Sequence, residues 1–219
     1  MPLQNRVKPN GEIVISESRG SLMGNRGNLH NEHKELIRQT RSSYKGWVAC
    51  LLKFEGIQRE IMSPGKYTEL FFLDEATAFS VGHRPCNDCQ KDRLKEFKKI
   101  WLSANESAYT LTGTNLKDID EVIHEERIDT NVNKETCSSE ISGLPDGTFV
   151  EFEDKYFLKW RNALLEWSFD GYISVVPIPS NKTAKVLTPK SIVRCFSSGF
   201  LPKVHESAKK YCSLDADRG

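Results

Sequence analysis

The segment that runs from Asp74 to Cys89 constrains this 219-residue chain more than any other part of it. Asp74 is a residue type that caps helix N-termini, and the Glu-Ala-Thr-Ala-Phe-Ser-Val run after it predicts a short helix. Gly82 and the proline three positions later predict where that helix ends. Cys86 and Cys89 then follow at a spacing that can present two thiolates to one metal ion. The segment therefore predicts a stiff turn with a pair of thiols, here called the knuckle (residues 82–89).

Length and composition limit the class of protein. A chain of this size can bury a sizeable core without disulfides, as one large domain or two small ones. Its 31 basic and 30 acidic residues balance, so no global field attracts it to nucleic acid or to a membrane. It has no apolar run of about 18 residues and no apolar signal-peptide core near its start. With six scattered cysteines and one close pair, these features predict a cytoplasmic protein without a membrane partner.

Hydrophobic periodicity predicts an α+β fold in two parts. Residues 1–130 are expected to form a mixed domain around the knuckle, and residues 144–208 a smaller antiparallel β-rich unit closed by a short helix. The polar residues 131–143 are interpreted as a linker, and 209–219 as a tail. Helices are expected at 32–42, 75–81, 91–104, 117–128 and 191–198, and strands at 47–54, 58–62, 67–73, 148–152, 156–160, 164–168 and 172–176.

One short pattern occurs twice in the chain. Phe79 and Phe196 each lie three residues before a glycine, and a proline follows each glycine by three residues. This predicts two glycine-capped helix ends with the same local structure, in which His83 or Phe200 folds back on the last helical turn.

A closed structural zinc site needs four ligands, and Cys86 and Cys89 supply two. Cys50, on an expected strand, is a candidate for a third ligand, and a small buried thiol is the competing interpretation. His83 is another candidate, although an aromatic ring would pack equally well there. A redox dithiol is the other interpretation of the pair, but it requires a thioredoxin-like βαβ context, and here the pair follows a proline. We therefore expect zinc as cofactor, and the full set of candidate ligands is Cys86, Cys89, Cys50, His83, His30, His33, His124 and His205.

The glycine-rich stretch between residues 19 and 30 is the second candidate site. Its three glycines permit a ligand to approach the backbone closely, and Arg19, Arg26 and His30 could contact an anion. The competing interpretation is a loop of tight turns whose arginines pair with carboxylates. The stretch is not a phosphate-binding loop, because the Gly-Lys-Ser/Thr sequence is missing.

A basic stripe follows the knuckle. Between residues 91 and 99 there are five basic and two acidic residues on an expected amphipathic helix. Such a stripe can bind phosphates, and it can equally be a solvated helix face. The candidate nucleic-acid-binding residues are Lys91, Arg93, Lys95, Lys98 and Lys99.

An acidic helix supplies the candidates for an enzymatic site. Residues 118–129 include six acidic residues, and Asp120 and Glu121 are spaced to reach His124 on one helix face. That arrangement would suit acid–base chemistry. The competing interpretation is a solvated acidic helix with an incidental histidine.

The run around the knuckle resembles the second half of the metal-binding module of the Ada DNA methyl-acceptor proteins, and the small Ada-like zinc domains of some bacterial nucleases. The match covers residues 72–89 only, with His83 in place of the family's aromatic residue. The family's first ligand pair lies upstream and is represented here by Cys50 alone, so the resemblance makes Cys50 the first choice for a third ligand, ahead of His83 and His205. The resemblance therefore implies a zinc-binding, DNA-repair-like context but no methyl transfer. The whole chain also resembles bacterial proteins that share its opening Met-Pro-Leu-Gln-Asn-Arg-Val, a resemblance that implies no activity. The matching residues are Phe72, Glu75, Ala76, Gly82, Arg84, Pro85, Cys86 and Cys89.

The leading hypothesis is a cytoplasmic protein with an Ada-like knuckle that binds or acts on nucleic acid. The first alternative is a hydrolase-like enzyme whose site lies between the glycine-rich stretch, His83 and His124, with a purely structural knuckle. The second alternative is a metal-free interaction module.

Overall fold

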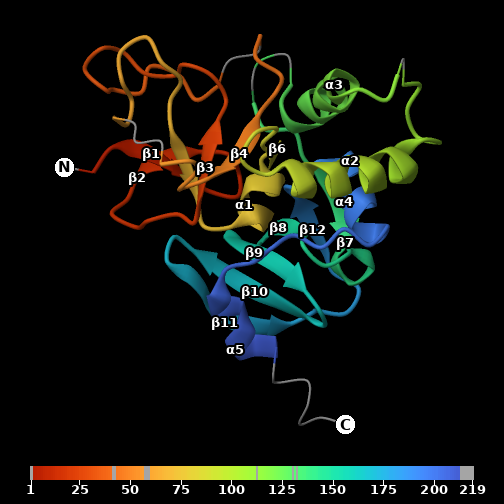
Figure 1. Cartoon of the computed structure of the whole chain (residues 1–219). Coiled ribbons are helices and arrows are strands. Elements are labelled where there is room, and N and C mark those ends of the chain that lie inside the picture. The colour runs from red at the N-terminus through yellow and green to blue at the C-terminus, as the bar shows by residue number, and fades with distance from the viewer. Residues whose placement is uncertain are drawn as a thin grey trace.

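Two six-stranded β-sheets with helices packed between and beside them form the fold of this computed structural model (Figure 1). The structure describes residues 2–40, 43–56, 60–111, 113–129, 131 and 133–212. The predicted α+β class is confirmed. In the described ranges no helix is both long enough and apolar enough to cross a membrane.

The first sheet is mixed and brings the knuckle beside an upstream strand. Its strand order is β2-β1-β5-β3-β4-β6, and the β1–β5 and β4–β6 pairs are parallel. The two-residue strand β6 lies within the knuckle, so the knuckle lies at the sheet edge next to β4. The strands are β1 (Gln4–Val7), β2 (Ile13–Ile15), β3 (Leu22–Asn25), β4 (Val48–Leu51), β5 (Leu70–Phe72) and β6 (Arg84–Pro85).

The second sheet is antiparallel throughout, in the order β11-β10-β9-β8-β12-β7. Four of its strands lie where alternation predicts them, because each turn between them is short and polar. The strand β7 lies inside the stretch interpreted as a linker and pairs with β12. The strands are β7 (Cys137–Glu140), β8 (Phe149–Phe152), β9 (Lys155–Trp160), β10 (Ala163–Ser168), β11 (Gly171–Pro177) and β12 (Thr183–Val186).

Two of the helices, α1 and α3, begin at residues that the capping rules favour. Asp74 accepts a hydrogen bond from the Thr77 backbone N–H at the start of α1, as predicted. Asn115 does the same for α3. The helices are α1 (Glu75–Ser80), α2 (Lys91–Asn105), α3 (Leu116–Arg127), α4 (Lys190–Ser197) and α5 (Lys209–Cys212), with 3-10 turns η1 (Ile141–Gly143) and η2 (Glu206–Ala208).

The two predicted glycine-capped ends have the same backbone structure. Gly82 and Gly199 have φ values of +75° and +98°. The His83 and Phe200 N–H groups each donate back to the carbonyl five residues earlier, at 2.9 and 3.2 Å. Glycine is favoured at both positions because other residues rarely adopt this left-handed conformation.

One continuous interior connects the elements of both predicted parts. The ring of Phe79 from α1 packs against Phe97 of α2, Phe196 of α4 and Phe200, with centroids 5.3 to 5.6 Å apart. A second cluster joins Leu73, beside α1, to buried residues of the antiparallel sheet, including Trp167. A third cluster joins α1 to buried residues of the first sheet, so the helix lies between the two sheets and packs on both (Figure 1).

Two local predictions were wrong. Residues 32–40 form turns and a short bridge rather than a helix, because the Asn31 side chain accepts from the N–H groups of His33 and Glu35 and Lys34 has a positive φ of 63°. Residues 60–62 form a turn rather than the end of a strand. The remainder of these two segments (41–42 and 58–59), and residues 213–219 of the predicted tail, lie outside the described residues.

Candidate metal centre

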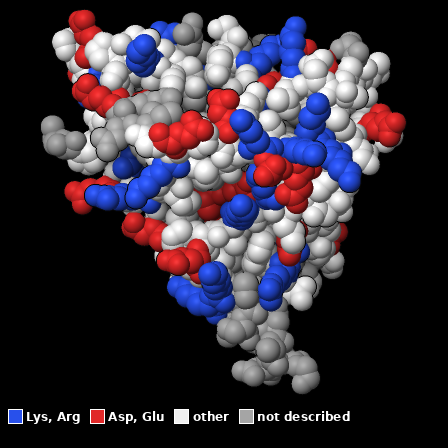
Figure 2. Space-filling view, in the orientation of Figure 1, with Lys and Arg blue, Asp and Glu red and all other residues white. Residues whose placement is uncertain are grey.

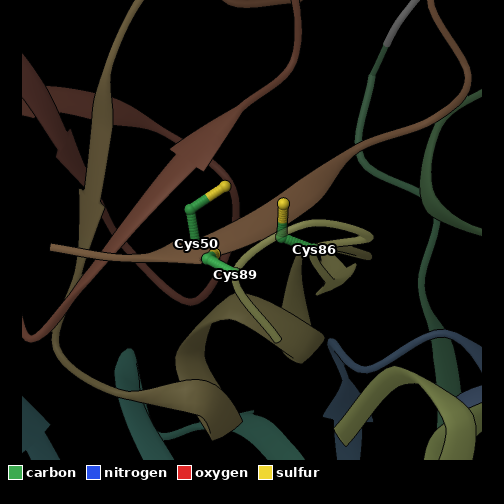
Figure 3. A group of neighbouring side chains, drawn as sticks. All are labelled: Cys50, Cys86 and Cys89. Atoms are coloured by element: carbon green, nitrogen blue, oxygen red, sulfur yellow. The ribbon is translucent and has the colours of Figure 1, made fainter. Parts of the chain in front are cut away.

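Three cysteines from two segments of the chain come together at the edge of the first sheet. The sulfur atoms of Cys50, Cys86 and Cys89 all lie within 4.8 Å of one another. Cys50 comes from β4, and the other two come from the turn that precedes α2 (Figure 3). The structure thus brings together the predicted pair and the first-choice third ligand.

The parallel pairing of β4 with β6 produces this arrangement. Val48 pairs with Arg84 and Ala49 with Pro85, and the Cys86 N–H donates to the Ala49 carbonyl at 2.9 Å. This register places Cys86 beside the end of β4, one residue after the paired positions. Cys50 follows Ala49 on that strand, so strand pairing alone brings the two thiols close together.

Backbone N–H groups also point at two of the sulfurs. The Leu51 N–H donates to Cys89 Sγ at 3.3 Å, and the Asp88 N–H donates to Cys86 Sγ at 3.4 Å. Such bonds favour the charged thiolate, which is the form that binds metal.

The three thiols influence one another's protonation. A hydrogen bond from Cys50 lowers the pKa of Cys86 to about 5, and the backbone donors assist, although burial acts in the opposite direction. The same hydrogen bond, with burial, raises the pKa of Cys50, and burial raises the pKa of Cys89. Without metal, the cluster therefore carries one thiolate at neutral pH, centred on Cys86.

Zinc fits this donor set. Sulfurs bound to one tetrahedral zinc at about 2.3 Å lie about 3.8 Å apart, and the three thiol sulfurs already lie within 4.8 Å of one another. Within the described ranges, the group of His, Cys, Asp and Glu side chains that could share one ion holds these three cysteines only. Three protein ligands leave a fourth coordination position.

A cavity of about 790 Å³ lies against the cluster and is here called the cysteine cavity. The three cysteines form one part of its wall, together with Arg84, Asn87 and the buried Glu69. The rest of the wall is largely apolar and aromatic: Met23, Tyr44, Val48, Leu51, Leu52, Phe54, Ile61, Tyr67 and Phe71. A ligand in this cavity could therefore reach a metal held by the three sulfurs.

The predicted ligand His83 lies elsewhere. Its ring packs against Trp47 and Phe72, with centroids 5.1 and 4.7 Å away, and neither ring nitrogen has a hydrogen-bond partner among the described residues. Burial, and then the nearby Arg26 and Arg127 cations, hold the pKa of His83 well below its usual value. His83 is therefore a neutral ring packed among aromatic side chains.

The three candidate anion-binding residues of the glycine-rich stretch have different surroundings. His30 is buried and its ring nitrogens contact Thr68 Oγ1 at 2.7 Å and the Ser63 carbonyl at 3.1 Å, so it holds the loop in place. Arg19 is exposed. Arg26 is buried, and its guanidinium lies 4.6 Å from the Trp47 ring centroid.

The basic stripe on α2 is only partly available to a ligand. Arg93 donates to both carboxylate oxygens of Glu75, at 3.0 and 2.6 Å, and to the Leu201 carbonyl, so it joins α1, α2 and the chain after α4. Basic side chains gather over α2 with acidic ones beside them (Figure 2). Lys91, Lys95 and Lys99 are exposed and Lys98 is half-buried.

The predicted acid–base helix has a different arrangement. Asp120 pairs with Arg84 rather than with His124, and His124 Nδ1 lies 2.8 Å from Arg127 Nη2. His83 and His124 both pack around Trp47, and neither lines the cysteine cavity. Of the other candidate histidines, His33 is exposed and His205 contacts Ser207 at the start of η2.

Sequence reasoning did not find the partner of Arg84 or the aromatic wall of the cavity. Asp120 is one of six acidic residues in its segment, and nothing in its local sequence distinguishes it. Tyr44 comes from one segment of the chain and Tyr67 and Phe71 from another, and only the fold brings the two segments together. No protein-family model, curated protein or solved structure matches this chain.

Proposed function

We propose that this chain is a zinc-binding knuckle protein of Ada-like type, whose metal has one exchangeable position facing the cysteine cavity, and that it binds or acts on nucleic acid. The observation that carries the metal assignment is the convergence of three sulfurs within 4.8 Å on a cavity wall. Zinc sites with three protein ligands and an open position are typical of metal centres that contact a ligand or substrate, whereas closed sites are structural.

The surroundings of the metal site support a nucleic-acid ligand. Aromatic side chains in the cavity wall offer flat faces on which a base could stack. Helix α2 begins at Lys91, two residues after Cys89, and it carries exposed lysines that could contact phosphates. The chemistry of the cavity and that of the helix thus suit the two parts of one nucleotide chain.

The metal assignment is tested by elemental analysis of protein purified without a histidine tag. We expect about one zinc per chain, lost in Cys86→Ser and Cys50→Ser and retained in Cys137→Ser, which changes a half-buried cysteine of β7. Chelation should lower the free energy of unfolding by several kcal/mol, because the folded state alone brings the three cysteine ligands together and metal binding therefore stabilises it. A zinc content below about a tenth of an equivalent in the wild type would contradict the assignment.

The open position is tested by cobalt substitution. Cobalt(II) held by three thiolates and one exchangeable ligand has ligand-field absorption bands that shift when a small ligand such as azide replaces that fourth ligand. We expect such a shift at azide concentrations that leave the protein folded. A spectrum that azide does not change would favour a closed, structural site.

The nucleic-acid part is tested separately, by titrating a labelled duplex and a labelled single strand. Affinity should fall steeply between about 50 and 200 mM salt if several phosphates are contacted. The double variant Lys95→Gln/Lys99→Gln should weaken binding and flatten its salt dependence, whereas Lys185→Gln, an exposed lysine of β12, should not. Absence of binding at the lower salt concentration would remove nucleic acid from the proposal and leave the metal assignment standing.

A further inference from the structure

A second cavity, of about 220 Å³, lies on a different part of the molecule and shares no lining residue with the cysteine cavity. Its wall includes Arg26, the C-terminal residue Arg127 of α3, and Lys134, with Trp47 among the other residues. We call it the cation cavity. Both guanidinium groups lie close to the indole of Trp47, with their carbon atoms 4.6 and 3.6 Å from the ring centroid.

The cations of this cavity have hydrogen-bond donors without acceptors. Arg26 is 2% exposed, and only its Nη1 reaches acceptors, the Gly11 and Gln39 carbonyls at 3.4 and 3.2 Å. Its Nε and Nη2 have no partner among the described residues, and neither does Nε of Arg127. Buried donors of this kind are rare in folded proteins unless a ligand or an ordered water accepts from them.

Lys134 adds a third positive charge to the same wall. Its Nζ donates to the Ser80 carbonyl at 2.6 Å, which uses one of three N–H groups. Burial, and then the positive charges of Arg127 and Arg26, lower the pKa of Lys134 to about 7. Burial also lowers the pKa of Arg26 to about 9. The three cations therefore lie close enough to repel one another.

Acidic side chains near the cavity are occupied by other partners. Glu12 lines the cavity, but its carboxylate pairs with Lys8 at 2.7 Å near the surface. Asp120 favours the charged form of Arg127, but both of its oxygens accept from Arg84. Among the described residues, the positive charge of Arg26 and Lys134 is thus without a paired carboxylate, an arrangement that is unfavourable unless an anion compensates it.

We propose that the cation cavity binds a phosphate-sized tetrahedral anion, either free phosphate or the phosphoryl group of a larger molecule. Two guanidinium edges and one ammonium group match the several oxygens of such an anion. The buried Thr40 hydroxyl, which also lines the cavity and lacks a partner among the described residues, supplies a further donor. The site is independent of the cysteines and of the proposed zinc.

The competing explanation is purely structural: the cations pack on Trp47 and satisfy backbone carbonyls. The two explanations differ in what happens when Lys134 loses its charge. If the cavity is an anion-binding site, Lys134→Gln should leave the melting temperature in chloride buffer unchanged or raise it. The substitution removes the repulsion between Lys134 and the two arginines. A structural lysine would give a lower melting temperature in every buffer.

The test measures the melting temperature of the whole chain against inorganic phosphate, with chloride keeping the ionic strength constant. A ligand that binds the folded state only raises the melting temperature in a saturable way. We expect that rise in the wild type and in the control Lys185→Gln, and an apparent affinity weakened by about tenfold or more in Lys134→Gln. If that variant does not fold, Arg26→Lys, which keeps the charge and loses the guanidinium fork, gives the same comparison.

A matched pair of ligands identifies the source of the anion. A nucleoside 5′-monophosphate that binds more tightly than inorganic phosphate, while the nucleoside alone does not bind, would assign the cavity to a phosphoryl group on a nucleotide. Equal affinities would assign it to free phosphate, and both results support the proposal. A wild-type melting temperature that neither compound raises above the chloride control, or a full phosphate response in both Lys134→Gln and Arg26→Lys, would overturn it.

Discussion

Arg84 and Asp120 form a bidentate ion pair that connects the knuckle to helix α3. Arg84 Nε donates to Oδ1 at 2.7 Å and Nη2 donates to Oδ2 at 2.8 Å, and the two side chains are 5% and 12% exposed. The remaining nitrogen, Nη1, donates to Asn87 Oδ1 and to the Pro85 carbonyl. One arginine therefore organises the turn between the two knuckle cysteines and anchors it.

Asp120→Asn should lower the free energy of unfolding by about 3–5 kcal/mol, because it leaves the buried Arg84 charge without its partner. Glu121→Gln on the same helix is the matched control. That side chain is 41% exposed and lies 3.8 Å from Lys45, so the change should stay below about 1 kcal/mol. Urea unfolding of both variants gives the comparison, and equal effects would show that the ion pair does not hold the knuckle.

Cys86 should react fastest of the cysteines in the metal-free protein. Its pKa of about 5 makes it a thiolate at neutral pH, and thiolates are the forms that alkylating reagents attack. Cys195 is the internal control, because burial raises its pKa to about 12. Mass spectrometry after brief iodoacetamide treatment should find Cys86 modified and Cys195 intact, and bound zinc should protect Cys86. Preferential modification of Cys195 would be incompatible with this arrangement.

The same pKa predicts how the stability of the metal-free protein depends on pH. The Cys86 thiol releases its proton near pH 5 when folded and near 9.0 when unfolded. Between these values the unfolded chain binds more protons, so this contribution to stability is present above pH 9, and is lost as the pH falls through about 5. The raised pKa values of Cys50 and Cys89 act in the opposite direction only above pH 9. Cys86→Ser should therefore lose more stability, relative to wild type, at about pH 8 than at about pH 6.

Gly82→Ala should be more destabilising than Gly199→Ala, although both glycines cap a helix in the same way. Both substitutions place a side chain at positive φ, which costs about 1–2 kcal/mol. At Gly82 the new Cβ would also lie 2.6 Å from Arg127 Cδ, whereas at Gly199 no atom lies within 4 Å. The added clash should cost about 1–3 kcal/mol more, measured as a difference in unfolding free energy. Equal losses of unfolding free energy in the two variants would show that the Arg127 side chain moves away from the new Cβ without cost.

Local chemistry explains what the sequence could predict. The Asp74 cap, the Gly82 exit and the antiparallel strands depend on neighbours within a few residues, and the structure has all of them. Cys50 was selected because the Ada-like resemblance implies a ligand pair in the strand region upstream of the knuckle. The helix predicted for the polar segment 32–40 was wrong. The Asn31 side chain accepts hydrogen bonds from nearby backbone N–H groups, which favours turns over a helix.

Long-range pairing explains what the sequence could not predict. The glycine-rich stretch suggested that Arg26 meets an anion, but its neighbours Arg127 and Lys134 come from an acidic helix and from the stretch interpreted as a linker. The local sequence of each of these two segments predicts a solvated surface. The folded chain brings the three cations together around Trp47, which no local pattern indicates.

Tyr172→Phe should destabilise both sheets together. Tyr172, on β11, donates its hydroxyl to Asp74 Oδ2 at 2.6 Å, and the same carboxylate caps α1 and accepts from the His205 N–H. Burial already raises the pKa of Asp74, so the loss of one donor to this buried carboxylate should cost about 1.5–3 kcal/mol. Because α1 packs on both sheets, unfolding followed by far-ultraviolet circular dichroism and by tryptophan fluorescence should show one shared transition, shifted equally in both signals.

The matched control for this last substitution is Tyr156→Phe, which removes a hydroxyl from a half-buried tyrosine of β9 in the same sheet. Its effect on the unfolding free energy should be small, because its ring packs against Trp167 and keeps that contact as phenylalanine. Two separate transitions in the wild type, or a Tyr172→Phe shift confined to one signal, would show instead that residues 1–130 and 144–208 unfold as independent units.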